Sequence, residues 1–287
     1  MKTIPIRNIT SAQKEQRNAG RFSIRKVEDI LKGNDLQHDL HRHNFFFILL
    51  IQSGEGIHEI DFISHPVRDK SVFLLRPGQV HQLQLKAGAV GYLMEFDTEF
   101  LRLADKQSAQ RLRKAGSKNF CEFEPNRFKK LHSLLADIFE ECTNKQEGYK
   151  EAIRADLEIF FIEYVRQSDN PDSTHISNNA YLQERFEEFT ELLEKNVSTQ
   201  KQVSFYTSST NLSSYQLNEI TKTAVGKTAS AMIDEYIVLE AKRYLLATPY
   251  QIKEIADHLG YEDPSYFIRF FKKHTGLSPD AFRKNFK

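Results

Sequence analysis

A short segment near the end of the chain combines basic side chains with the spacing of an amphipathic helix. After the helix-start signal Asp263-Pro264, Phe267 and Phe271 lie four residues apart and predict a buried helix face. Arg269 falls on another face, where a guanidinium can donate two hydrogen bonds to a guanine and neighbouring lysines can bind phosphates. These side chains favour nucleic-acid recognition. The residues expected on the recognition face are Ser265, Ile268, Arg269, Lys272 and Lys273.

The same arrangement occurs a second time, about 50 residues earlier. Gly226 corresponds to Gly276, and Lys222 corresponds to Lys272. A repeat of this kind predicts two copies of one helical unit. In the first copy the residues expected to face the nucleic acid are Ser214, Tyr215, Asn218 and Glu219.

Signals for the start of a helix stand where a helix-turn-helix unit requires them. Each combines a polar N-cap residue with a proline at the first helical position or a glutamine that closes a capping box. These signals are Ser213 with Gln216, Thr248 with Pro249 and Gln251, and Asp263 with Pro264. An apolar-periodic segment, 230–246, predicts the helix that joins the two units. Two such units at this spacing can address successive major grooves, about 34 Å apart.

Three histidines in the N-terminal half form a second candidate site. His41 and His43 are two residues apart and share one side of a predicted strand, and His81 can approach from a facing strand. Three converging imidazoles are compatible with a metal ion, with hydrogen bonding inside the domain, or with the lining of a small-molecule pocket. The remaining histidines of this region are expected on the surface or in loops: His38, His58 and His65.

The elements that position these groups differ between the two halves of the chain. Residues 20–100 alternate short β-rich runs with turn signals, which predicts a barrel or sandwich. Two helices follow, and the first carries an apolar stripe that packs either on the barrel or on a second subunit. The stripe consists of Phe128, Leu131, Leu135, Ile138 and Cys142. A polar, turn-rich stretch at 168–180 predicts a linker, and helical periodicity continues from there to the end.

Composition is that of an ordinary globular protein of 287 residues with a net charge of +1. Residues 181–287 contain 14 Lys and Arg against 14 Asp and Glu, so a nucleic-acid surface requires the positive charge to be concentrated on one face. No apolar run approaches a membrane span, and the N-terminus lacks a secretory signal. Cys121 and Cys142 have no metal-type spacing. We therefore expect a cytoplasmic protein without membrane association.

The segment Gly260–Pro279, with Ser265-Tyr266-Phe267-Ile268-Arg269-Phe270-Phe271 at its centre, resembles the signature of the AraC/XylS family of bacterial transcription regulators. The connecting segment 233–243 resembles the helix that joins the two units in that family. The resemblance covers residues 181–287. It implies binding to double-stranded promoter DNA, contact with RNA polymerase as an activator, and an N-terminal domain that senses a small molecule or dimerises.

The histidine region resembles the two short motifs of a cupin barrel, through His41-Arg42-His43 and Pro77-Gly78-Gln79-Val80-His81. Metal-binding cupins usually add a glutamate, and Phe47 and Ile48 stand where it is expected. The resemblance therefore favours an effector-binding or hydrogen-bonding role for the histidines over a metal site.

The first helix-turn-helix unit departs from the AraC pattern in four places. Threonines replace apolar residues at Thr207, Thr210 and Thr221, and Glu219 occupies a position that is often basic or polar. A buried hydroxyl requires a hydrogen-bond partner, and a carboxylate repels phosphates. We therefore expect the second unit to contribute more of the base-specific binding.

These observations predict an α+β protein of several domains. Residues 1–125 form a cupin-like sensor barrel, 126–167 a helical dimerisation segment, 168–180 a linker, and 181–287 an all-α domain with two helix-turn-helix units. The predicted function is that of a homodimeric DNA-binding transcription regulator, an activator controlled by a small molecule. The alternatives are a metal-dependent cupin enzyme fused to a DNA-binding domain, and a ligand-independent regulator with a purely dimerising barrel. We expect no catalytic residues, metal or cofactor, since no nucleophile motif, phosphate loop or dinucleotide fingerprint occurs.

Overall fold

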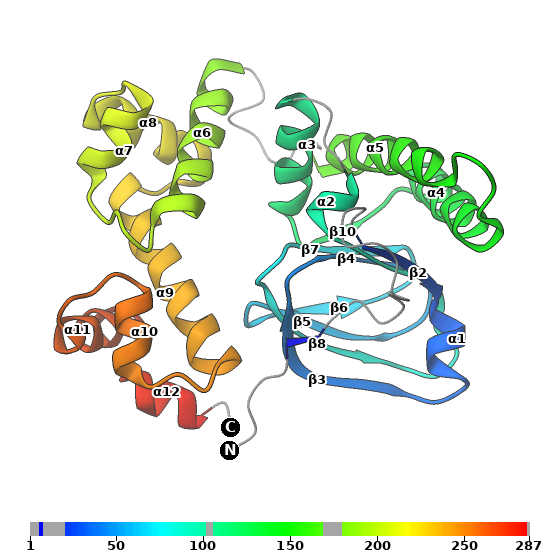
Figure 1. Cartoon of the computed structure of the whole chain (residues 1–287), viewed down its shortest axis with the longest axis horizontal. Coiled ribbons are helices and arrows are strands. Elements are labelled where there is room, and N and C mark those ends of the chain that lie inside the picture. The colour runs from blue at the N-terminus through cyan, green and yellow to red at the C-terminus, as the bar shows by residue number, and fades with distance from the viewer. Residues whose placement is uncertain (1–5, 8–20, 102–105, 169–179, 286–287) are drawn as a thin grey trace. The chain divides into compact units, whose positions relative to one another are not determined.

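The chain folds into two compact units that divide near residue 170 in a computed structural model (Figure 1). The structure describes residues 6–7, 21–101, 106–168 and 180–285. The predicted linker therefore lies almost wholly outside the described residues. None of the described helices is long and apolar enough to span a membrane.

Two five-stranded sheets make up most of the N-terminal unit. One has the strand order β1-β3-β8-β5-β6 and the other β10-β7-β4-β9-β2, and all neighbours are antiparallel except β1 and β3. The expected cupin-like barrel is thus present as two separate sheets, because the described strands do not close into one hydrogen-bonded ring. The strands are β1 (Ile6–Arg7), β2 (Phe22–Lys26), β3 (Leu36–His43), β4 (Phe46–Ser53), β5 (Gly56–Ile60), β6 (Ile63–Val67), β7 (Ser71–Leu75), β8 (Val80–Leu85), β9 (Val90–Phe96) and β10 (Phe120–Glu122).

Strand β4 is apolar on both faces because its sheet lies between two hydrophobic layers. Phe47, Leu49 and Ile51 belong to the core between the two sheets. The alternate residues Ile48 and Leu50 belong to a second core, which the helices cover. A half-buried strand alternates apolar and polar residues, whereas a strand buried on both faces reads as one continuous run.

Helices cover the outer face of the β4-containing sheet. They are α2 (Thr98–Leu101), α3 (Lys106–Gly116), α4 (Pro125–Asn144) and α5 (Tyr149–Ser168), and the short α1 (Val27–Leu31) follows β2. The apolar stripe of α4 is buried in the same core as β4, with Leu131, Leu135 and Ile138 fully buried. The stripe packs on its own sheet, which is one of the two alternatives that the sequence left open.

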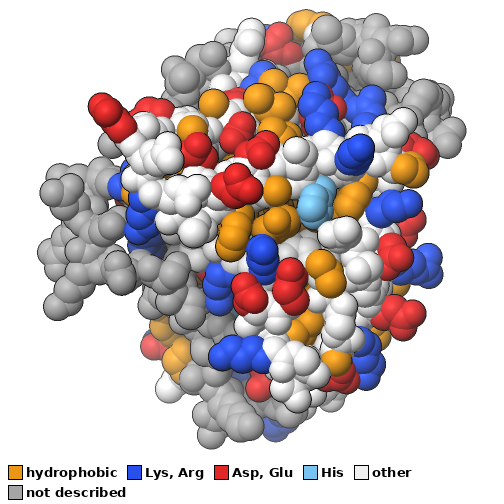
Figure 2. Space-filling model, turned by 90° about the vertical axis from the view of Figure 1, so that its right-hand side faces the viewer, with side chains coloured by type: hydrophobic (Ala, Val, Ile, Leu, Met, Phe, Trp, Pro, Cys, Tyr) orange, Lys and Arg blue, Asp and Glu red, His pale blue; other side chains and the backbone are white. Residues whose placement is uncertain are grey.

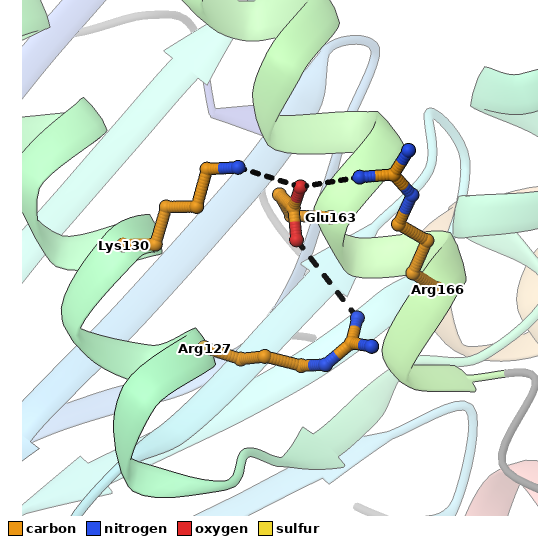
Figure 3. Close-up of polar contacts among 4 residues, drawn as sticks. All are labelled: Arg127, Lys130, Glu163 and Arg166. Atoms are coloured by element: carbon orange, nitrogen blue, oxygen red, sulfur yellow. Dashed lines mark hydrogen bonds and ion pairs between the residues drawn. The ribbon is translucent and has the colours of Figure 1, made fainter.

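A cluster of ion pairs around the buried Glu163 carboxylate joins α4 to α5, and its three basic partners are partly exposed (Figure 3). The carboxylate of Glu163 lies 2.8 Å from Lys130 Nζ, 2.8 Å from Arg166 Nη1 and 3.8 Å from Arg127 Nη1. The hydrogen bond from Lys130 holds the pKa of Glu163 below its ordinary value. Because Lys130 and Arg127 lie on α4 and Glu163 lies on α5, the cluster fixes how the two helices pair.

One face of the N-terminal unit carries a mixed surface. Figure 2 shows hydrophobic side chains gathered near the middle of this face, bordered by lysine, arginine and acidic side chains. On α5, Ile159 is 39% exposed, whereas Ile153, Leu157 and Phe160 of the same helix have no exposed surface. Part of the helical layer therefore presents apolar side chains to solvent.

The C-terminal unit is entirely helical in the part that the structure describes. A long helix, α9, links two helix pairs, α7–α8 and α10–α11 (Figure 1). Its buried residues, among them Ile233, Ile237 and Leu245, run along most of its length and pack on both pairs. The helices are α6 (Ala180–Asn196), α7 (Val203–Thr210), α8 (Ser214–Val225), α9 (Ala229–Ala247), α10 (Ile252–His258), α11 (Pro264–Thr275) and α12 (Pro279–Asn285).

Two of the three predicted helix starts are confirmed. Ser213 and Gln216 form the capping box of α8, and Asp263 caps α11 with Pro264 at its first position. The start predicted at Thr248 is wrong, because α10 begins three residues later with Gln251 as its N-cap. Thr248 instead ends α9, where its hydroxyl donates to the carbonyl of Tyr244.

Candidate functional site

Helix α11 presents a polar face opposite a fully buried aromatic one. Phe267 and Phe271 have no exposed surface, as their i, i+4 spacing predicted. Asp263 accepts a hydrogen bond from the backbone N–H of Ser265, and this bond lowers the pKa of the Asp263 carboxyl. The cap fixes where the helix begins and so which side chains emerge on its open side.

The side chains predicted to read DNA on α11 are all exposed. They are Ser265, Ile268, Arg269, Lys272 and Lys273. Tyr266, which the sequence did not single out, is 57% exposed, and its ring lies 5.9 Å from the guanidinium carbon of Arg269. The Tyr266 ring therefore lies beside the Arg269 side chain and limits the conformations that the arginine can adopt.

Helix α8 has a different exposed face. Ser214, Tyr215 and Glu219 are exposed, with Tyr215 at 74%. Asn218 is half-buried, and its Oδ1 accepts a hydrogen bond of 3.0 Å from the backbone N–H of Ala229 at the start of α9. Asn218 therefore caps the connecting helix, a role that its exposed position in the sequence pattern did not reveal.

The three threonines that depart from the family pattern each have a hydrogen-bond partner within their own helix. The Thr210 hydroxyl donates to the Tyr206 carbonyl at 2.7 Å, and the Thr221 hydroxyl donates to the Asn218 carbonyl at 3.2 Å. Thr207 donates in the same way to Ser204. Back-bonding of this kind satisfies a buried hydroxyl at little cost. The departures from the family pattern thus leave the helix pair intact.

Two basic side chains of the C-terminal unit, Lys201 and Arg283, donate hydrogen bonds to backbone carbonyls of other segments of that unit. Lys201, just before α7, donates to the carbonyl of Gly260 at 2.8 Å, and its ammonium lies 4.6 Å from the ring centre of Tyr261. Arg283 donates to the carbonyls of Leu245 and Tyr250. These two bonds give Arg283 a structural role within the C-terminal unit.

The predicted histidines of the N-terminal unit do come together. His41, His43 and His81 are at most 3% exposed, and one ring nitrogen from each lies within 4.8 Å of those of the other two. His41 pairs with His81 across β3 and β8. The distance between His43 Nε2 and His81 Nε2 is 3.0 Å. The pairing of β3 with β8 thus brings the two short motifs into one cluster.

A fourth histidine, His58 on β5, belongs to the same cluster. Its Nε2 lies 2.8 Å from His81 Nδ1, and the side chain has no exposed surface. Placing His58 on the surface or in a loop was therefore wrong. The sequence did contain a signal: His58 is two residues before the buried Ile60, so both side chains lie on the inward face of β5. Ile57 obscured this alternation, because an isoleucine suggests a buried position although its side chain is exposed.

Backbone carbonyls fix the protonation of two of these rings. His41 Nδ1 lies 2.7 Å from the Asp39 carbonyl and His43 Nδ1 lies 3.1 Å from the Phe45 carbonyl. A carbonyl only accepts, so each Nδ1 carries a proton, and in the neutral form of each ring the lone pair is on Nε2. Burial lowers the pKa of His58 and of His81 well below the ordinary histidine value, so these rings are neutral at pH 7.

The surroundings of the cluster are aromatic. The ring of Phe47 lies 5.1 Å from His81 and 5.6 Å from His43, and Phe73 lies 4.8 Å from His58. Phe47 thus occupies the position next to the imidazoles where the cupin pattern has a glutamate.

A separate open pocket of about 740 Å³ lies at the ends of the strands. Its lining mixes polar and apolar side chains and includes none of the four clustered histidines. The lining residues are Asp35, Leu36, Gln37, Gly54, Glu55, Gly56, Ile57, Pro66, Val67, Arg68, Asp69, Gln84, Leu85 and Lys86. The open pocket is thus separate from the buried histidine cluster.

Comparisons with known proteins divide the chain in the same way as its fold. Residues 31–158 match a family model described as an AraC-like ligand binding domain, and residues 206–285 match one described as a helix-turn-helix domain. The first match contains the four histidines, and the second contains both helix pairs apart from the start of α7.

Relatives of similar length include two regulators. The uncharacterized HTH-type transcriptional regulator YfiF of Bacillus subtilis (strain 168) is 22% identical over 259 residues, which cover 86% of this chain and 79% of the relative. The HTH-type transcriptional activator RhaR of Mannheimia succiniciproducens is 24% identical over 254 residues, covering 86% and 87%. Among solved structures, ToxT from Vibrio cholerae O395 aligns over 93% of this chain and 98% of its own, with 13% identity and a TM-score of 0.43.

Proposed function

The chain belongs to the AraC family of DNA-binding transcription regulators, and on this premise we propose that the exposed faces of α8 and α11 bind operator DNA. The observation that carries the proposal is the duplicated helix pair. In each copy a capped helix buries one face and exposes another, and α9 connects the two copies. This arrangement suits two successive major grooves.

The proposed DNA contacts divide by chemistry. On α11, Arg269 donates to a guanine, Ser265 and Ile268 contact neighbouring base edges, and Lys272 and Lys273 bind phosphates. On α8, Ser214, Tyr215 and Glu219 face the DNA, and Asn218 supports them through its bond to α9.

The N-terminal unit is proposed to bind the effector at the cluster of His41, His43 and His81. Their burial between aromatic rings and the match of residues 31–158 to a ligand binding domain support this assignment. Under this proposal residues 1–125 sense the effector, and the helical segment 126–167 follows them. Residues 168–180 then link this N-terminal part to the DNA-binding domain at 181–287. The protein acts in the cytoplasm, without catalysis, as an activator that contacts RNA polymerase.

We further propose a homodimer formed through the helical segment 126–167. The α4 stripe is buried, so the contact uses the outward side of the helices, where Ile159 is exposed. Sedimentation of the full chain at tens of micromolar tests this: a dimer that Ile159→Lys dissociates supports the interface, and a monomer contradicts it.

Genome-wide mapping of bound sites tests the proposed function. We expect discrete sites that share a bipartite sequence, and genes beside them whose transcription changes when the regulator is deleted. Uniform occupancy without a shared sequence would contradict sequence-specific regulation. The class of the neighbouring genes would also indicate the chemistry of the effector.

A further inference from the structure

We propose that His41, His43 and His81 form a binding site for a divalent transition-metal ion of the zinc type, coordinated through their Nε2 atoms. The inference deepens the effector role proposed for this cluster and rests on it. Three protein ligands leave a fourth position of a tetrahedral ion open, which is the arrangement of zinc sites that accept an exogenous ligand.

The first argument is the orientation of the donor atoms. His41 and His43 both donate Nδ1–H to backbone carbonyls, at 2.7 and 3.1 Å. These bonds place a lone pair on Nε2 of each ring and hold the ring in position. Metal-binding histidines show the same second hydrogen bond, because it fixes the tautomer and raises the basicity of the ligand nitrogen.

The second argument is distance. Nitrogen ligands at about 2.0–2.1 Å from a tetrahedral zinc ion lie about 3.4 Å from one another. His43 Nε2 and His81 Nε2 are 3.0 Å apart, and one ring nitrogen of each of the three residues lies within 4.8 Å of those of the other two. Side-chain adjustments of about an ångström therefore suffice to close the site.

The third argument is the behaviour of the hydrogen-bond chain. Since His43 Nε2 has the lone pair, the 3.0 Å contact requires His81 to donate from Nε2, and His81 Nδ1 then accepts from His58 Nε2. A metal ion takes the place of the His81 proton. That proton moves to Nδ1, which donates to His58 Nε2, and the His58 proton moves from Nε2 to Nδ1. Both rings remain neutral and no proton is released.

His58 is therefore a positioning residue. It does not contribute to the ligand set, but it accepts the Nδ1–H of His81 when the Nε2 lone pair binds the ion. Its own Nδ1 has no hydrogen-bond partner among the described residues, so this ring can carry its proton on either nitrogen. Loss of such a partner typically lowers metal affinity about 10–100-fold.

The donor set also defines the metal class. Neutral imidazoles suit zinc, copper, nickel and cobalt, whereas magnesium and calcium require oxygen ligands. Three neutral ligands leave the charge of the ion uncompensated in an apolar site. The open fourth position therefore favours an anionic ligand, such as hydroxide or the carboxylate of an effector.

Metal titration of the full chain tests the inference directly. We expect one equivalent of Zn²⁺ to bind with a Kd of about 1 µM or tighter, Co²⁺ to give the visible absorption of a tetrahedral site, and Mg²⁺ not to bind. His43→Ala and His81→Ala should abolish binding, and His58→Leu should weaken it about 10–100-fold. His132→Ala, which removes a half-buried histidine from α4, is the matched control and should bind as the wild type does.

Circular dichroism and thermal unfolding establish that each variant is folded, and His41→Ala provides a second ligand variant if His81→Ala is unstable. The inference is overturned if the wild type binds no Zn²⁺, or if folded ligand variants bind it unchanged. Titration of the same samples with DNA distinguishes the proposed metal site from the proposed DNA-binding function. DNA binding without zinc binding would refute the metal site alone, and zinc binding without DNA binding would refute the proposed function alone.

Discussion

The two helix-turn-helix units share a backbone plan but carry opposite chemistry on their exposed faces. Both recognition helices start at a side-chain cap and end at a glycine with positive φ, Gly226 and Gly276. Where the second unit has the exposed Arg269, the first has the exposed Glu219. A duplicated fold has therefore kept the framework of the helix pair and changed what it presents.

The difference extends to the neighbouring positions. Ile268 is 37% exposed on α11, whereas its counterpart Asn218 caps α9. Lys273 has a neutral counterpart, Thr223. The first unit therefore offers fewer donors to bases and less positive charge to phosphates, and we expect it to act as a clamp while the second unit supplies most of the specificity.

The largest expected effect is that of Arg269→Ala. Loss of a bidentate guanine contact costs about 1–3 kcal/mol, so operator affinity should fall roughly 5–150-fold while affinity for random DNA changes little. Titration of operator and random duplexes at fixed salt measures both. Lys253→Ala, which removes an exposed cation from α10, is the control. Unchanged operator affinity for the Arg269 variant would show that another face of α11 reads the bases.

Asn218→Ala should act on stability rather than on base recognition. Removal of its bond to Ala229 leaves the start of α9 with one N–H less satisfied, which costs about 0.5–2 kcal/mol in free energy of unfolding. Urea unfolding compared with Glu219→Ala separates the two roles. If the Asn218 variant is as stable as the wild type but loses operator binding selectively, Asn218 contacts a base rather than acting only as a cap.

Lys273→Ala should weaken binding to all sequences alike. Loss of one phosphate contact lowers the slope of log affinity against log salt by about 1. Titrations at several salt concentrations on both duplexes measure that slope. A loss confined to the operator would mean that Lys273 contacts a base.

Glu219→Ala is expected to have the smallest effect, and in the opposite direction. Removal of a negative charge near the phosphates should raise affinity for random DNA slightly. The same salt series detects this change. A fall in operator affinity would instead show that Glu219 accepts a hydrogen bond from a base such as cytosine.

The framework of both regions could be predicted from the sequence because it follows from local patterns. The i, i+4 aromatic pair of α11 and the caps at Ser213 and Asp263 are short-range signals, and the structure confirms them. The helix start predicted at Thr248 was wrong because a threonine before a proline can also stand at the end of a helix. Here the Thr248 hydroxyl donates to the carbonyl of Tyr244 in the last turn of α9.

Contacts between distant segments could not be predicted in this way. His58 enters the histidine cluster only because β5 pairs with β8, and Asn218 caps a helix that begins eleven residues later. The α4 stripe has the periodicity of a dimer seam, but the outer face of the β4-containing sheet covers it. In each case the partner was set by tertiary packing, which periodicity alone does not specify.

Footprinting with two double variants tests the inequality of the units most directly. Tyr215→Ala with Glu219→Ala truncates two of the α8 side chains proposed to face the DNA and spares the Asn218 cap. Ser265→Ala with Arg269→Ala truncates two on α11. We predict that the α8 variant keeps a full operator footprint at modestly higher protein concentration, whereas the α11 variant loses it. Loss of the whole footprint by the α8 variant, with its retention by the α11 variant, would contradict the account.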